Sequence, residues 1–173
     1  FEFFRQDGTL HPLSRSEVHL IMIEKQAFYR TLNQQAQALL EGEPDMIATL
    51  ANLSALLNQE LADINWVGFY LLQGETLVLG PFQGKPACVR IPVGRGVCGT
   101  AVAEGKTQLV DDVHQFAGHI ACDGASNSEI VIPLRRGGEI IGVLDIDSPI
   151  FNRFDEQDRI GLEETVQILE SML

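Results

Sequence analysis

Apolar residues recur at helical spacing near both ends of the chain and alternate at strand spacing in its middle. A helix is expected after Met22, with an apolar face made of Phe28, Leu32, Ala36 and Leu39. The turn at 41–44 ends it, and Asp45 opens a second helix with the stripe Met46, Leu50, Leu53 and Leu57. Asp155 can cap a final helix that buries Leu162, Val166, Leu169 and Leu173. Two helices therefore lead the chain, and one closes it.

Six short segments between these helices have the period of two that is typical of strands. They are expected at about 65–72, 76–79, 88–93, 107–110, 129–134 and 139–147. Most connections are short, as in the turns at 73–75 and 135–138, which favours an antiparallel sheet. The expected fold is α+β: the N- and C-terminal helices pack on one face of the sheet, and loops and a short helix at 94–105 cover a ligand pocket on the other.

The first 21 residues do not fit this plan. Gly8, Pro12 and the pair Ser14 and Ser16 interrupt any regular period, so no clean element is expected there. We expect a single domain over residues 22–173 and interpret residues 1–21 as an N-terminal extension or an artefact of the assigned start.

Successive side chains along a strand point to opposite faces of the sheet, so the face of each residue can be predicted in three of the expected strands. Segment 139–147 has one apolar face, made of Ile140, Gly142, Leu144 and Ile146. Its other face carries Glu139, Ile141, Val143, Asp145 and Asp147. In 129–134 the apolar face is Ile130, Ile132 and Leu134, which puts Glu129 opposite. The three carboxylates Glu129, Asp145 and Asp147 are therefore expected on the sheet side away from the helices, together with Trp66 and Tyr70.

Carboxylates beside aromatic rings suit a cationic ligand. Ring faces attract an ammonium group, and carboxylates accept its hydrogen bonds. The alternative is a solvated face, which acidic residues at strand ends commonly form. We favour a pocket because the acidic and aromatic residues coincide near a loop that carries a cysteine.

That cysteine, Cys122, lies among the small and polar residues of 118–129. Cysteines retained for packing occur more often in apolar elements, and reactive groups gather on loops. The three cysteines, Cys88, Cys98 and Cys122, have the spacing C-x9-C-x23-C. From the residues alone, thiol chemistry that uses two of them and three idle thiols both stay open.

Two other motifs are weak. Gly94, Gly96 and Gly99 fit a dinucleotide fingerprint, but no regular alternation of strands and helices follows, so a tight turn is the better interpretation. His114 and His119 with Cys122 match no usual zinc spacing, and solvated histidines are expected.

Charge and length limit the partners. The 173 residues suggest one core, and the net charge of −12 argues against nucleic acid and anionic membrane surfaces as partners. No apolar run approaches the length of a membrane helix, and no secretory pattern opens the chain. An odd count of three cysteines fits the reducing cytoplasm. The oligomeric state stays undecided between a monomer and a homodimer.

Four segments carry a resemblance to a known family: 64–72 (INWVGFYLL), 77–105 (LVLGPFQGKPACVRIPVGRGVCGTAVAEG), 118–134 (GHIACDGASNSEIVIPL) and 140–151 (IIGVLDIDSPIF). From about Met22 onward the chain resembles the GAF-domain free methionine-(R)-sulfoxide reductases, and all three cysteines fall where that family has them. The resemblance implies reduction of free methionine-(R)-sulfoxide to methionine, with thioredoxin as the reductant and without a cofactor or metal.

The same resemblance implies roles for single residues. Cys122 matches the catalytic cysteine, whose thiolate would attack the sulfoxide sulfur and become a sulfenic acid. Cys88 matches the resolving cysteine, which would form a disulfide with Cys122 that thioredoxin reduces, and Cys98 matches a third cysteine with an auxiliary or alternative resolving role. The matched substrate-pocket positions are Trp66 for the methyl group, Tyr70, and Glu129, Asp145 and Asp147 for the amino group and the sulfoxide oxygen.

Two other functional classes compete with a reductase. A small-molecule GAF sensor would regulate an attached output domain, for which this chain has no room, and would not need three cysteines in these segments. A redox-sensing thiol protein without turnover would form disulfides independently of any substrate.

Overall fold

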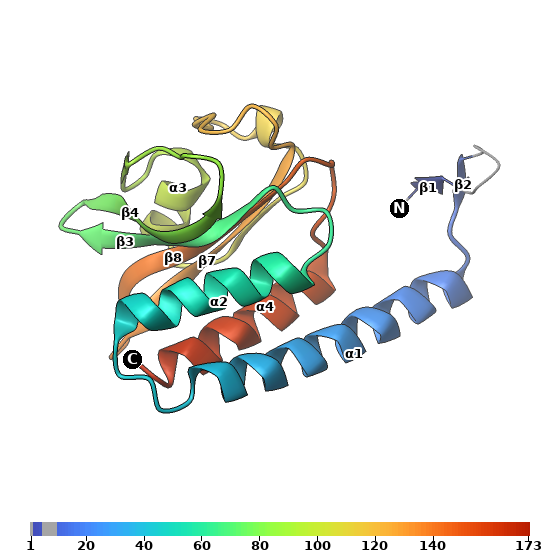
Figure 1. Cartoon of the computed structure of the whole chain (residues 1–173). Coiled ribbons are helices and arrows are strands. Elements are labelled where there is room, and N and C mark those ends of the chain that lie inside the picture. Colours follow the sequence, from blue (N-terminus) through green and yellow to red (C-terminus); the bar gives the residue numbers. More distant parts are fainter. Residues whose placement is uncertain (1, 5–9) are drawn as a thin grey trace.

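The centre of the molecule is an antiparallel sheet of six strands (Figure 1). This computed structural model describes residues 2–4 and 10–173. The strands are β3 (Trp66–Gln73), β4 (Thr76–Gly84), β5 (Arg90–Pro92), β6 (Gln108–Val110), β7 (Ser128–Arg136) and β8 (Glu139–Ser148). Their order across the sheet is β5-β4-β3-β8-β7-β6. The expected α+β fold with a six-stranded antiparallel sheet is confirmed.

Helices α2 (Met46–Glu60) and α4 (Glu156–Glu170) pack on one face of this sheet, and the long helix α1 (Arg15–Leu40) packs on these two helices. The short helix α3 (Gly96–Glu104) lies over the opposite face (Figure 1), and the 3-10 turn η1 (Val113–Gln115) precedes the cysteine-bearing loop. The predicted stripe of the second helix is confirmed, because Leu50, Leu53 and Leu57 are fully buried in the core between helices and sheet. None of the helices in the described part of the chain has the length and apolar character needed to span a bilayer.

The N-terminal part differs from the prediction. β1 (Glu2–Phe4) pairs with β2 (Leu10–Pro12), and α1 begins at Arg15 and passes residue 22 without a break. Ser14 caps α1: its hydroxyl accepts from the backbone N–H of Glu17, whose carboxylate accepts from the backbone N–H of Ser14. The expectation that no clean element precedes Met22 was wrong, because Ser14 starts a helix instead of interrupting one.

A buried polar network fixes α1 to α4. Asp158 on α4 accepts hydrogen bonds from Lys25 Nζ and from the Tyr29 hydroxyl, both at 2.6 Å. Its own burial opposes ionisation, but the bonds from Lys25 and Tyr29 outweigh that effect and lower its pKa. The charge of Asp158 is therefore paired, as a buried carboxylate requires.

Two strand predictions need correction. β4 continues through Gly80 and Pro81, where a loop was expected, and β5 is shorter than 88–93. Pro81 is tolerated because β5 pairs only with Thr76–Val78 of β4, which leaves the rest of β4 as an edge that needs no further ladder donor.

The predicted face of Ile141 also needs correction. In β8, Leu134 pairs with Gly142 but Arg135 pairs with Ile140, so Ile141 is an extra residue in a bulge. Ile141 consequently packs against the helix-side core and not on the opposite face.

Candidate active site

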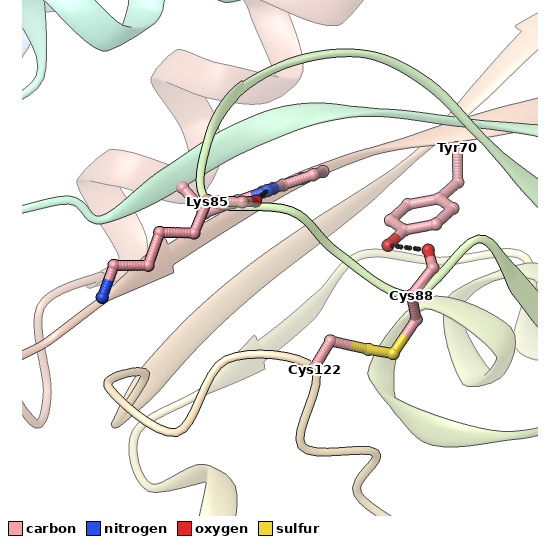
Figure 2. Close-up of a disulfide and its surroundings, with 5 residues drawn as sticks. Tyr70, Lys85, Cys88 and Cys122 are labelled. Carbon is pink, nitrogen blue, oxygen red and sulfur yellow. Dashed lines mark hydrogen bonds between the residues drawn. A yellow bond between two sulfur atoms is a disulfide. The ribbon is translucent and has the colours of Figure 1, made fainter.

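A disulfide joins Cys88, just before β5, to Cys122 in the loop between η1 and β7 (Figure 2). The two Cα atoms lie 5.5 Å apart, although the residues are separated by 34 positions in the chain. This is the pair that the family resemblance implied. The third cysteine, Cys98, is free and buried near the start of α3.

Cys122 lines a pocket between the sheet and α3. The same pocket is lined by every other predicted site residue except Cys88, namely Trp66, Tyr70, Cys98, Glu129, Asp145 and Asp147. The cavity measures about 40 Å³, which holds a few water molecules but no amino acid. In the disulfide-linked state the pocket is therefore closed to a ligand of amino-acid size.

Strand register brings the acidic side chains together. Asp147 on β8 pairs with Trp66 on β3 and with Glu129 on β7, so these three residues form one row across neighbouring strands. Asp145 lies two residues before Asp147 and shares its face of the sheet. The strand register therefore brings the three carboxyl groups together, as the alternation of side chains along the strands predicted.

Aromatic rings build one wall of the pocket. The Trp66 ring stacks on Tyr70 at 5.9 Å and on Phe82 at 5.1 Å between ring centroids. Trp66 Nε1 donates to the carbonyl oxygen of Lys85, and the Tyr70 hydroxyl donates to that of Cys88 at 2.8 Å. These two bonds hold the segment that carries Cys88 against β3.

Burial and mutual repulsion perturb the three carboxyl groups. The pKa of Glu129 is raised by burial and then by the charges of Asp145 and Asp147. Burial also raises the pKa of Asp147, as does the charge of Asp145. Burial raises the pKa of Asp145 as well, although hydrogen bonds with Glu129 and the Cys98 thiol oppose that rise. Because three adjacent carboxyl groups, of which Glu129 and Asp145 are buried and Asp147 is half-buried, cannot all ionise cheaply, the cluster retains a proton that it can donate.

Cys98 faces this cluster and is only 4% exposed. Its thiol donates a hydrogen bond to Asp145, and burial, followed by the charges of Asp145 and Glu129, raises its pKa. Since the thiolate and not the thiol is the nucleophile, Cys98 is poorly activated for attack in this conformation. Cys122 sits on a loop of small and polar residues, where its sulfur is bonded to that of Cys88.

Sequence reasoning missed the residues that hold the Cys122 loop. Asn65 Nδ2 donates to Asp123 Oδ2 at 3.0 Å and to Ser126 Oγ at 3.1 Å, and both acceptors line the pocket. In the sequence, Asn65 directly precedes Trp66 and Asp123 directly follows Cys122, and this adjacency was the available signal. His119 also lines the pocket and is half-buried, so the expectation of a solvated histidine holds only for His114, which is exposed. The pKa of His119 is lowered by burial and by the neighbouring His114.

Comparisons with known proteins cover most of the chain. The sequence profile of the GAF domain matches residues 35–173. The free methionine-R-sulfoxide reductase of Escherichia coli (strain K12) is 62% identical over 151 residues, which are 87% of this chain and 92% of that protein.

Two solved structures resemble the fold closely. The fRMsr of Staphylococcus aureus in complex with substrate superposes with a TM-score of 0.81 at 61% identity, over 84% of this chain and 95% of that one. The free methionine-R-sulfoxide reductase from Neisseria meningitidis in complex with its substrate superposes with a TM-score of 0.83 at 48% identity, over 86% and 89% of the two chains.

Proposed function

The chain belongs to the GAF-domain family of free methionine-R-sulfoxide reductases, and we propose that its pocket reduces free methionine-(R)-sulfoxide to methionine by thiol chemistry. One observation carries the proposal: the Cys88–Cys122 disulfide borders a pocket lined by the buried carboxyl groups of Glu129 and Asp145 and by the half-buried Asp147. Such a pocket suits the sulfoxide of an amino acid. The carboxyl groups can bind its ammonium group and supply a proton, and the cysteine pair can reduce its sulfur.

Substrate binding in this proposal uses both walls of the pocket. The substrate's ammonium group donates hydrogen bonds to the carboxylates, which act as its counter-ions, and the Trp66 face contacts the methyl group. Asp145 Oδ1 is buried without a hydrogen-bond partner among the described residues, so it is a ready acceptor. A peptide lacks the free ammonium group and would leave buried carboxylates unpaired, which favours the free amino acid.

The first chemical step uses Cys122 and a protonated carboxyl group. We propose that Glu129 or Asp147 donates a proton to the sulfoxide oxygen while the Cys122 thiolate attacks the sulfur. Methionine leaves with two more electrons, and Cys122 keeps the oxygen as a sulfenic acid. The raised pKa values of Glu129 and Asp147 support this role, because a carboxyl group must still hold its proton near neutral pH to act as an acid.

The second step regenerates the thiol. The Cys88 thiol attacks the sulfenic sulfur, water leaves, and the Cys88–Cys122 disulfide forms. A dithiol reductant of the thioredoxin class then reduces this disulfide by exchange, at the cost of its own oxidation. We place the enzyme in the cytoplasm, where such reductants are maintained.

A stereoselective assay on the purified, reduced chain tests the proposal. Thioredoxin-coupled turnover is expected on free methionine-(R)-sulfoxide, little on the S form, and little on the same sulfoxide within a peptide. Disulfide formation without turnover on the free R form would overturn the proposal in favour of a redox-sensing protein.

A further inference from the structure

Three potential metal ligands from three different elements meet in the pocket. The Sγ atom of Cys98 on α3 and one carboxylate oxygen each of Glu129 on β7 and Asp145 on β8 all lie within 4.8 Å of one another. All three side chains are buried, with exposures of 4%, 6% and 5%. A thiol and two carboxylates are thus held together away from water.

A second observation shows that this cluster lacks a partner. Asp145 Oδ1 is buried and has no hydrogen-bond partner among the described residues. The described pocket lining contains one basic side chain, His119, and no lysine or arginine. Buried carboxylates are normally paired with a cation or coordinate a metal. The cluster therefore offers negative charge and free lone pairs to a cation that can enter the pocket.

We propose that Cys98, Glu129 and Asp145 form a binding site for a soft divalent cation of the Zn²⁺ class. Zn²⁺ takes thiolate sulfur at about 2.3 Å and carboxylate oxygen at about 2.0–2.2 Å, usually with four ligands in a tetrahedron. Ligands at these distances lie about 3.5 Å apart, so the three groups need to close by little more than about 1 Å. Water in the remaining pocket space completes the fourth position.

Binding requires no change of oxidation state. The Cys98 thiol releases its proton to solvent when the metal–sulfur bond forms, and a proton retained by the carboxyl groups leaves in the same way. Cys88 and Cys122 take no part as ligands, so the ion does not alter their disulfide bond. Zn²⁺ bound at this site inhibits the proposed reaction, because it occupies carboxylates that the substrate needs.

The consequence for catalysis rests on the proposed function. A Zn²⁺ ion on Glu129 and Asp145 competes with the ammonium group of methionine sulfoxide for the same carboxylates. Zn²⁺ is expected to raise the apparent KM for the sulfoxide and leave kcat unchanged at saturating substrate. Metal binding itself is measurable without turnover, so it can fail or succeed independently of the reductase activity.

The disulfide makes a direct test available. In the oxidised chain Cys98 is the single free thiol, so the thiolate-to-metal absorption band of bound Cd²⁺ reports on it alone. Titration of the oxidised chain with Cd²⁺ should produce this band at one equivalent, and calorimetry should show one Zn²⁺ site. Cys98→Ser should abolish the band, and Glu129→Gln should weaken Zn²⁺ binding at least about tenfold.

A matched control separates this site from surface binding. Glu139→Gln removes an exposed carboxylate at the other end of β8 and should leave the affinity for both ions unchanged. Thermal unfolding of each variant checks that it is folded. The site is refuted if the oxidised chain gives no Cd²⁺–thiolate band, or if Cys98→Ser binds Zn²⁺ as tightly as the unsubstituted chain.

Discussion

The Tyr70 hydroxyl donates a 2.8 Å hydrogen bond to the carbonyl oxygen of Cys88, so a pocket residue on β3 holds the segment that carries one half of the disulfide (Figure 2). The Tyr70 ring is buried, and burial followed by the charge of Asp145 raises its pKa, so the hydroxyl stays protonated and donates. Tyr70 therefore both lines the proposed substrate pocket and positions Cys88, the proposed resolving cysteine.

Tyr70→Phe should slow recycling more than the first chemical step. The substitution keeps the ring but frees the Cys88 segment, at a cost of about 1 kcal/mol for the lost hydrogen bond. Rapid-quench kinetics should show a normal burst of methionine followed by slower disulfide formation. Tyr29→Phe is the matched control, because the other tyrosine bonds to Asp158 and lies far from the disulfide in the fold. Equal effects of both substitutions on disulfide formation would contradict this assignment.

The two bonded cysteines should separate kinetically. Cys122→Ser should reduce turnover to background, because no nucleophile remains. Cys88→Ser should release about one equivalent of methionine and then stall as a sulfenic acid, which a dimedone-type reagent can trap on Cys122. Release of methionine by Cys122→Ser would transfer the nucleophilic role to another cysteine.

The oxidised chain should not bind its substrate. With the Cys88–Cys122 disulfide closed, the cavity is about 40 Å³, too small for an amino acid. Calorimetry with free methionine, the product, should detect binding to the reduced chain and none to the oxidised one. The variant Cys88→Ser, which cannot close the disulfide, should bind under both conditions. Tight binding to the oxidised chain would show that the pocket opens without reduction.

Glu129→Gln should lower kcat yet stabilise the fold at alkaline pH. The folded state raises the pKa of Glu129 through burial and the charges of Asp145 and Asp147, so ionising it is costlier in the folded than in the unfolded chain. That penalty is absent below the unfolded pKa of about 4.3, grows as pH rises above it, and is complete above the folded pKa. Glutamine removes the penalty, by about 1 kcal/mol or more, which corresponds to about 2–4 °C in Tm.

Unfolding of Glu129→Gln measured at about pH 5 and about pH 8 checks this pH dependence. The gain over the unsubstituted chain should be larger at the higher pH. Glu139→Gln, which changes an exposed residue on β8, should show no gain at either pH. The same gain for Glu129→Gln at both pH values would mean that folding does not raise the pKa of Glu129.

Gly161→Ala should destabilise the packing of α1 on α4. A Cβ atom at Gly161 would lie well inside contact distance of the buried Tyr29 ring. Alanine improves helix propensity by about 1 kcal/mol, but overpacking costs about 1–3 kcal/mol, so a net loss is expected. Chemical denaturation measures it, and Gly124→Ala, where a Cβ meets nothing within 4 Å, is the control. A more stable Gly161→Ala would show that Tyr29 moves freely.

The local pattern of apolar and polar residues was sufficient to predict much of the fold and of the pocket lining. Strand alternation is a property of a few consecutive residues, and it assigned Trp66, Glu129, Asp145 and Asp147 to the same side of the sheet. Helical periodicity likewise identified the buried stripe of α2. It failed at Ile141, because a bulge depends on how two strands are paired and not on either strand alone.

Contacts between distant segments were decided only by the tertiary structure. The order β3-β8-β7 places Trp66, Asp147 and Glu129 in one row, and no local signal encodes which strands are neighbours. The fold likewise brings together Cys88 and Cys122, which are separated by 34 positions in the chain. It also brings the Cys98 thiol from α3 onto Asp145 of β8. Such contacts depend on loop closure and strand register, which the whole chain settles together, whereas the sequence by itself determines which face each side chain occupies.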